Sequence, residues 1–538
     1  MHKRNILRQN YTLFSRPYQL KLPLEIGHII PDNDCVRLLG QFVEELDLRD
    51  LYSTYSRVKE NQVSPRQMLK IMLYAYHEHN YSSRGIEKAC RRDINYMYLL
   101  EGRSAPDHAT IARFRSIHFA QVADKYLAMT VNYLMELGEI SGREIFIDGT
   151  KIEANANKYT FVWKKAVTKN QAKLLDKTAV LVQECIETYG LREIWRGQVK
   201  EKHLGKLLKR LYKIKDEEGV EFVHGSGCRK TQLQKHIELL EEYTERLKEY
   251  SQKLEVLGDR NSYSKTDPDA TFMRMKEDAM LNGQLKPAYN LQLGVDSGYI
   301  SWLMLSPRPT DTNTLIPFLT GMEATLRHKY PVVVADAGYE SEENYSFLED
   351  HRITAMIKPA NYEISRTKKY KADISRKENM PYDPDGDFYT CRNGCRLYAC
   401  GINERKSFSG YICRETVYRC RDCVGCQYKA ECIKGRNWKI PEEERFKRLS
   451  VSRTFERQRK ECLERITSEE GIKLRVNRSI QAEGSFALWK EDGSFRQFLC
   501  RGQANVYAES VLMAIAQNID NLHRRIQNGK LGMHLYEV

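Results

Sequence analysis

No run of 18 apolar residues occurs in the sequence, so it contains no candidate transmembrane helix. Its first residues, MHKRNILRQNYTLFSRPYQ, also lack the apolar segment of a secretory signal peptide. Together with a mean hydropathy of −0.61, these absences predict a soluble, cytoplasmic protein with no membrane partner.

The sequence has fewer acidic than basic residues, with 72 Asp and Glu and 86 Lys and Arg, which gives a net charge of +14. This excess favours a polyanionic partner, because basic side chains neutralise phosphate groups. A length of 538 residues is enough for three or four domains with a sizeable core.

Two apolar runs each carry a single aspartate. In REIFIDGTKIEA, residues 145–147 predict a short interior strand, and Asp148 follows directly. In PVVVADAGYES, a β-branched run ends on Asp336. A buried carboxylate is costly unless it is paired, and Gly149 would let the backbone turn close to a ligand. The pattern therefore suggests a metal ion as the partner of both acids.

A third acid, Glu483, stands in the helix-like stretch SIQAEGSFALWK. Lys490 follows seven positions later, about two turns away on the same helical face. Two strand-borne aspartates and one helix-borne glutamate predict a metal site of oxygen ligands, which favours Mg²⁺ or Mn²⁺ over Zn²⁺. The alternative for Glu483 and Lys490 is a surface ion pair.

These stretches resemble the DDE transposases of bacterial insertion sequences, in the group with an N-terminal helical domain and a cysteine-rich insert. The resemblance covers nearly the whole chain and rests on FIDGTKIEANANKYTFVWKK, LKPAYNLQLGVD, VVVADAGYES and RSIQAEGSFALWKEDGSFRQFLCRG. It implies a ribonuclease H-like catalytic core, divalent-metal phosphoryl transfer and binding of the element's own terminal repeats.

The resemblance implies catalytic and metal-binding roles for Asp148, Asp336 and Glu483, around two Mg²⁺ or Mn²⁺ ions. The family places Tyr, Arg, Glu and Lys near the helical acid, with six residues between Glu and Lys, as Glu483 and Lys490 have. The Arg here is Arg478, five positions before the Glu, and no Tyr stands at the usual place. Lys490 and Arg478 are expected to hold DNA phosphates.

Residues 1–135 are predicted to be helical, because their apolar residues recur at three-and-four spacing. The stretch SSRGIEKACRRDINYMYLL predicts two short helices, the first ending in Arg91 and Arg92, which would suit a helix-turn-helix contact with DNA. The alternative is a plain bundle with a solvated basic face. The resemblance favours binding of DNA ends and contacts within a dimer.

The remaining pattern predicts an α/β core of three strands, helix, strand, helix and strand, the order that a ribonuclease H-like fold requires. Its second and third strands meet at Asp296, which is expected to serve the turn rather than catalysis. The predicted segments are a helical DNA-binding and dimerisation domain (1–135), the start of the core (136–160), a helical insert (161–284), the core continued (285–360), a cysteine-rich zinc insert (361–440) and the C-terminal helical part of the core (441–538).

The helical insert contains KHIELLEEYTERLKEYSQKLEVLGD, whose near-heptad apolar spacing predicts packed helical hairpins. Such an arm is either solvated or holds DNA or a partner subunit. Residues 264–275 are expected to form a loop, and the resemblance makes Asp267 within it an active-site neighbour.

Eight of the 14 cysteines lie between residues 391 and 432. A cytosolic compartment keeps thiols reduced, so the cluster favours a metal over disulfides. One group has the spacing Cys-x2-Cys-x2-Cys-x5-Cys, which lets four thiolates bind one structural Zn²⁺: Cys420, Cys423, Cys426 and Cys432. The alternative is an iron–sulfur cluster. The remaining thiols either complete this site or form a second one: Cys391, Cys395, Cys400 and Cys413.

The expected function is a transposase that cleaves DNA at insertion-sequence ends and transfers the strand into target DNA by two-metal phosphoryl transfer. Its partners would be double-stranded terminal inverted repeats and target DNA, bound by a homodimer in the synaptic complex, with nucleoid association in the bacterial cell. The alternatives are a metal-dependent nuclease without strand transfer and a domesticated DNA-binding regulator.

Overall fold

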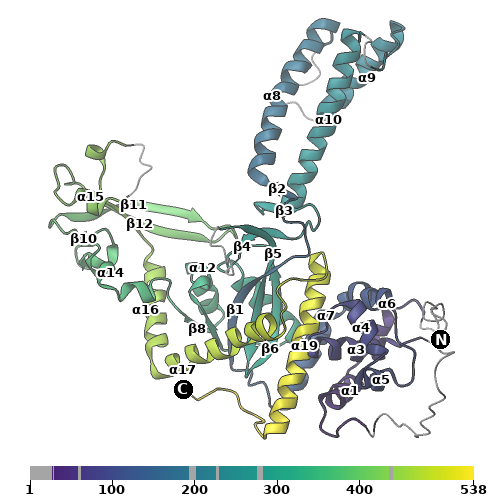
Figure 1. Ribbon diagram of the computed structural model, residues 1–538. Coiled ribbons are helices and arrows are strands. Elements are labelled where there is room, and N and C mark those ends of the chain that lie inside the picture. Colours follow the sequence, from purple (N-terminus) through teal and green to yellow (C-terminus); the bar gives the residue numbers. More distant parts are fainter. Residues whose placement is uncertain are drawn as a thin grey trace, which may run out of the picture. The chain divides into compact units, whose positions relative to one another are not determined.

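The computed structural model describes residues 27, 29–57, 62–192, 201–225, 229–275, 283–434 and 440–537 (Figure 1). The N-terminal stretch MHKRNILRQNYTLFSRPYQ, for which no signal peptide was predicted, lies outside the described residues. The chain forms two compact units, which divide between Phe114 and Arg115. Across these described ranges, no helix is both long and apolar enough to cross a membrane.

The first unit is helical, and α3 (Pro65–His77) is its most buried element. Ser64 accepts from the backbone N–H of Gln67, and the Gln67 side chain accepts from the backbone N–H of Ser64, so a capping box begins this helix. Both short helices predicted between residues 82 and 100 are present. The other helices of the unit are α1 (Cys35–Glu45), α2 (Arg49–Ser53), α4 (Ser83–Cys90), α5 (Ile94–Leu100) and α6 (His108–Arg113).

The second unit is built on a mixed sheet in the order β4-β5-β1-β7-β8, with β6 also paired to β5. Strands β1, β7 and β8 are parallel, while β5 runs antiparallel to β1. The predicted order of strands and helices is confirmed. The strands are β1 (Glu144–Glu153), β4 (Thr271–Arg274), β5 (Leu285–Asp296), β6 (Tyr299–Ser306), β7 (Val332–Ala335) and β8 (Thr354–Ile357), with α11 (Leu315–Leu326) and α12 (Glu342–Asp350) between them.

Helices from distant parts of the chain cover this sheet. The amphipathic helix α19 (Gln503–Asn528) packs on β6, and α7 (Ala123–Glu136) packs on α19 and β6. Helix α17 (Glu469–Arg478) lies against β1 and β7. It continues through a π-helical segment, η9 (Ser479–Glu483), a short α18 (Gly484–Ala487) and a second π-helical segment, η10 (Leu488–Asp492).

The insert after β1 is a bundle in which α10 (Gln232–Leu257) packs on α8 (Lys164–Tyr189) and α9 (Glu201–Glu217), which confirms the predicted helical packing (Figure 1). A ribbon of β2 (Phe161–Trp163) and β3 (Ser262–Ser264) closes its base. The prediction that residues 264–275 form a loop is wrong for residues 271–274. This segment becomes β4, because its Thr-Phe-Met sequence pairs with the edge of β5 and is buried there.

The cysteine-rich insert forms a five-stranded antiparallel sheet in the order β13-β12-β11-β10-β9. Its strands are β9 (Tyr382–Asp383), β10 (Phe388–Thr390), β11 (Arg396–Lys406), β12 (Ile412–Cys420) and β13 (Arg448–Val451), and α13 (Tyr362–Ser365), α14 (Lys368–Ala372) and α15 (Lys429–Cys432) flank them. The expected return to helix from residue 441 is wrong. Because β13 pairs with β12, regular α-helix resumes only at α16 (Arg453–Thr467).

Candidate active site

Asp148 and Asp336 lie side by side in the sheet. Strands β1 and β7 pair in parallel up to Ile147 opposite Ala335; Asp148 is the next residue of β1, and Asp336 directly follows the end of β7. Parallel neighbours are about 4.8 Å apart. Asp148 is buried, and its Oδ1 accepts from the N–H of Gly149 at 2.9 Å. Asp336 Oδ1 accepts from the N–H of Gly338 at 2.8 Å, which fixes its carboxylate in a tight turn.

Arg478 connects the helix to this pair. Its Nη2 donates to Glu483 Oε1 at 2.6 Å, and its Nη1 lies 3.7 Å from Asp148 Oδ2. Nη1 is buried and meets no hydrogen-bond acceptor among the described residues. The structure therefore brings four of the predicted site residues together: Asp148, Asp336, Arg478 and Glu483.

Lys490 is on the same helical stretch but in a different environment from Glu483. Lys490 is buried on η10, whereas the Glu483 side chain is half exposed. The two π-helical segments change the helical phase between them, so simple α-helical spacing does not describe this stretch. Glu483 forms its ion pair with Arg478, where the alternative interpretation had it paired with Lys490.

The predicted role of Gly149 in a turn is wrong, because β1 continues straight through it to Glu153. A Cβ at Gly149 would lie 2.4 Å from Gln292 Nε2 and 2.9 Å from Asp311 Oδ1. A side chain at this position would therefore have to displace the polar side chains that fill the space beside the strand.

Those side chains form a buried polar network that the sequence reasoning missed. Gln292 and Asn290 donate to Asp311 Oδ1 at 3.0 and 2.7 Å, and the Tyr339 hydroxyl donates to Gln292 Oε1. Burial, and then the nearby charges of Asp311 and the site aspartates, hold the pKa of Tyr339 well above its usual range. The available signal was Asn290 and Gln292 on one face of an otherwise apolar strand.

The site fits a cation, because a guanidinium is already stabilised between two of its carboxylates. Hard oxygen donors of this kind suit Mg²⁺ or Mn²⁺. Within the described ranges, however, no three His, Cys, Asp or Glu side chains converge closely enough to hold a metal ion. Arg478 accounts for this at the acidic site, since it stands between Asp148 and Glu483.

Two further aspartates tie elements together. Asp296 accepts from Gly142 N–H at 2.8 Å and Ser141 Oγ at 2.9 Å, in keeping with the structural role expected for it. Asp267 is fully buried and accepts from the Tyr289 hydroxyl and the Gly502 N–H, just before α19. Burial raises the pKa of Asp267.

In the first unit, Arg91 and Arg92 are exposed at the end of α4. Arg91 Nη2 forms an ion pair with Glu87 at 2.6 Å, one turn earlier. Helix α4 packs on both α5 and α6, and these contacts hold the helix whose exposed end carries Arg91 and Arg92.

The cysteines gather at one end of the β11–β12 hairpin, around a cavity of about 20 Å³, the size of a single ion or water. Its lining includes all four predicted zinc ligands together with Cys391. The Lys447 N–H points at Cys423 Sγ at 3.4 Å, and burial raises the pKa of Cys420 to about 12. Cys413 lies apart and donates to Glu342 Oε2 at 2.8 Å, while Cys400 is exposed on β11. Although these thiols line one cavity, no three of them converge closely enough among the described residues to form a metal-ligand set. The zinc prediction is therefore not supported by the structure.

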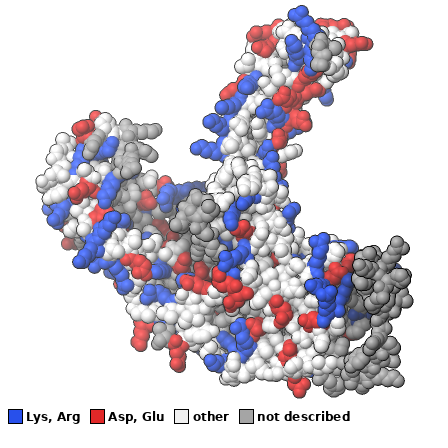
Figure 2. Space-filling model, viewed as in Figure 1, with Lys and Arg blue, Asp and Glu red and all other residues white. Residues whose placement is uncertain are grey.

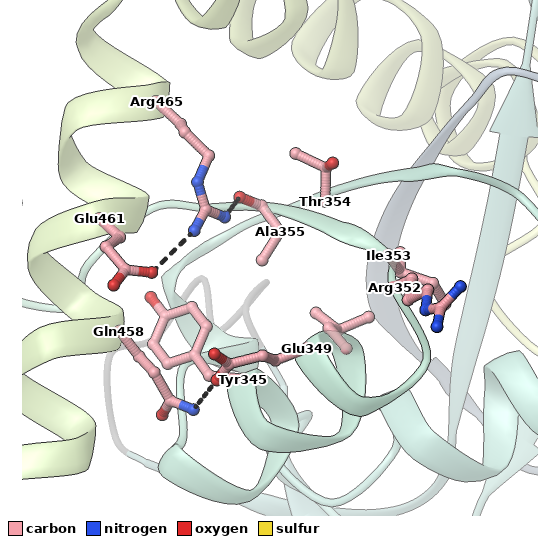
Figure 3. Close-up of a pocket in the computed structure, with 10 residues that line it drawn as sticks. Tyr345, Glu349, Arg352, Ile353, Thr354, Ala355, Gln458, Glu461 and Arg465 are labelled. Carbon is pink, nitrogen blue, oxygen red and sulfur yellow. Dashed lines mark hydrogen bonds and ion pairs between the residues drawn. The ribbon is translucent and has the colours of Figure 1, made fainter.

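A separate pocket of about 360 Å³ lies between α12, β8 and α16 (Figure 3). Arg465 donates to the Ala355 carbonyl at 3.1 Å, and Gln458 donates to Glu349 at 3.0 Å across it. None of the predicted site residues lines this pocket. Its polar contacts instead cover the outer edge of β8, which would otherwise present unpaired backbone groups.

This fold and site define a mixed α/β protein with an acidic centre where the parallel pairing of β1 and β7 ends. Two family models match the chain, one described as "Transposase domain (DUF772)" over residues 24–116 and one as "Transposase DDE domain" over residues 390–523. These two matches indicate a DDE transposase of an insertion sequence, a family in which DNA binding and divalent-metal use are typical. Neither the curated proteins nor the solved structures gave a match.

Proposed function

We propose that this transposase cleaves DNA at the ends of its insertion sequence and joins the freed 3′ end to target DNA. The observation that carries the proposal is the meeting of Asp148, Asp336 and the Arg478–Glu483 pair, which come from three distant segments. The strand order β6-β5-β1-β7-β8, antiparallel on one side and parallel on the other, supports a ribonuclease H-like core for this chemistry.

Asp148, Asp336 and Glu483 would hold two Mg²⁺ or Mn²⁺ ions. Such ions activate water or a 3′ hydroxyl and stabilise the leaving 3′ oxygen. Asp148 neighbours Asp336 across the paired strands and faces Glu483 across Arg478, so it is suited to serve both ions. Lys490 and Arg478 would bind backbone phosphates, Lys490 as a point charge and Arg478 through two parallel N–H donors.

The remaining segments would position DNA. The exposed Arg91 and Arg92 would contact the terminal repeats, and two chains would pair the two ends in a synaptic complex. We propose one structural Zn²⁺ in the cysteine-rich insert, bound by Cys420, Cys423, Cys426 and Cys432. We keep the six segments expected from the sequence with two changes of boundary. The N-terminal helical domain ends at Phe114, and the cysteine-rich insert extends through β13 to Val451.

The test is to incubate the purified protein with Mg²⁺ and DNA carrying the element's ends, and to map cut and joined strands. We expect cleavage and joining by the wild type, and neither by Asp148→Asn, which keeps the side-chain shape and should still bind the ends. Cleavage without joining would favour the nuclease alternative. Full cleavage by Asp148→Asn would reject the assigned site, and binding without cleavage by the wild type would favour a DNA-binding regulator.

A further inference from the structure

Arg478 occupies the space that a metal ion would need in order to bind both Asp148 and Glu483. Its two terminal nitrogens face Glu483 Oε1 at 2.6 Å and Asp148 Oδ2 at 3.7 Å. A Mg²⁺ ion requires each coordinating oxygen at about 2.0–2.1 Å. A metal ion therefore cannot bind both carboxylates while the guanidinium lies between them.

We infer that Arg478 is a positioning residue that exchanges places with the metal. Without metal, its positive charge holds Asp148 and Glu483 against their mutual repulsion. When metal binds both acids, the guanidinium is released and its donors become available to a backbone phosphate. The buried Nη1 has no hydrogen-bond acceptor among the described residues, and a phosphate oxygen would supply one once the guanidinium is released. This inference rests on the proposed function.

The experiment measures Mn²⁺ binding to the full-length protein without DNA, by calorimetry and by electron paramagnetic resonance. We expect Arg478→Gln to bind Mn²⁺ several-fold more tightly than the wild type, because a competing cation is removed, while Asp148→Asn binds more weakly. Ca²⁺ should strengthen binding of the wild type to duplex DNA, and should strengthen binding of Arg478→Gln less.

The outcomes separate this inference from the proposal on which it rests. If Arg478→Gln binds Mn²⁺ no more tightly while Asp148→Asn binds it more weakly, the exchange is wrong and the metal site stands. If Asp148→Asn and Asp336→Asn both bind Mn²⁺ as the wild type does, the metal site itself is wrong. Arg478→Lys retains the charge and should bind Mn²⁺ like the wild type, which controls for a general loss of packing.

The helical insert carries a line of basic side chains. Four lysines stand four positions apart on the exposed face of α8: Lys165, Lys169, Lys173 and Lys177. None of them forms an ion pair with a described residue, whereas Lys213 of α9 and Arg246 and Lys253 of α10 each pair with a glutamate one turn away. In Figure 2, basic side chains gather along the α8 side of the bundle.

Like charges at this spacing destabilise a helix, so the stripe costs stability unless an anion neutralises it. We propose that this lysine stripe of α8 binds the phosphate backbone of double-stranded DNA. The stripe spans about 18 Å, or 12 residues at 1.5 Å each, which covers about five successive phosphates at 3.4 Å of rise. A line of charges fits an extended polyanion better than a compact acidic protein.

The test compares the salt dependence of binding to a random-sequence duplex. Replacing all four α8 lysines with Gln should lower the slope of log K against log salt by about 3 to 4, at about 0.9 for each contact. The matched control carries the same charge change on α9, where four lysines are also exposed: Lys202, Lys206, Lys209 and Lys213. We expect this control to change the slope by less than one unit.

An equal decrease in both variants would mean a general charge effect and would overturn the proposal, as would an unchanged slope in the α8 variant. If the α8 variant instead alters sedimentation of the DNA-free protein, the stripe binds a second copy of the chain. Far-ultraviolet circular dichroism checks that α8 stays helical, and removal of the repulsion should, if anything, stabilise it.

Discussion

Glu483 and Lys490 share one helical stretch but are expected to act differently. Glu483→Gln should abolish cleavage and strand transfer together, because it removes a metal ligand. Lys490→Ala should lower turnover without eliminating it, and should make the salt slope of end binding shallower by about one unit, since one phosphate contact is lost. Strand-transfer assays and binding titrations at several salt concentrations measure both effects. An unchanged rate and slope in Lys490→Ala would remove Lys490 from the site.

Gly149 should be sensitive to the smallest substitution. In Gly149→Ala, the new methyl group would meet Gln292 Nε2 and Asp311 Oδ1 inside a packed site, which should destabilise the unit by about 1–3 kcal/mol. Gly484→Ala is the matched control, because a Cβ there meets nothing within 4 Å and alanine favours a helix by up to about 1 kcal/mol. Thermal unfolding compares the two, and equal midpoints would contradict the crowding around Gly149.

Glu509 should make stability depend on pH. It is fully buried and accepts from the N–H groups of Leu499 and Cys500, and burial raises its pKa above the ordinary value of 4.5. The folded protein therefore holds a proton that the unfolded chain loses above pH 4.5, so this contribution falls as pH rises through the folded pKa. The slope approaches about 1.4 kcal/mol per pH unit.

The matched variant for this effect is Glu509→Gln, which cannot titrate. Denaturant unfolding between pH 4 and pH 8 should show a flatter profile for the variant than for the wild type. If the two profiles are parallel, Glu509 is ionised in the folded protein, with Arg115 at 3.7 Å as its counter-charge.

At the scale of elements, the cysteine-rich sheet should depend on metal. The purified protein should contain zinc, and Cys423→Ser should lower the metal content and destabilise β11 to β13, because metal affinity there contributes to folding. Cys400→Ser is the control, since Cys400 is exposed on β11 away from the cavity. Elemental analysis with limited proteolysis measures both effects. Iron with sulfide, or no metal at all, would reject the zinc proposal.

At the scale of the whole molecule, two chains should assemble on two DNA ends. Sedimentation of Asp148→Asn with terminal-repeat DNA should give a complex of two chains and two duplexes, and the substitution keeps the DNA uncut. A stable complex of one chain with one end, at protein concentrations well above the dissociation constant, would contradict the proposed dimer.

Much of this architecture could be predicted from local sequence. The β-branched runs before Asp148 and Asp336, the turn at Asp296 and the capped start of α3 depend on neighbouring residues, so periodicity and turn chemistry were sufficient. The helices of the arm followed from their apolar spacing for the same reason. Segments whose structure depends on a distant partner were missed, as β4 and β13 were, because their pairing strands lie elsewhere in the chain.

The sequence by itself determined which two aspartates follow β-branched runs and which helical stretch carries the third acid. Only the tertiary structure decided that Arg478 lies between Asp148 and Glu483, and that Cys391 joins the thiol cavity while Cys413 does not. The physical reason is that local sequence specifies the backbone of each segment. The partners of a side chain instead depend on how segments hundreds of residues apart pack.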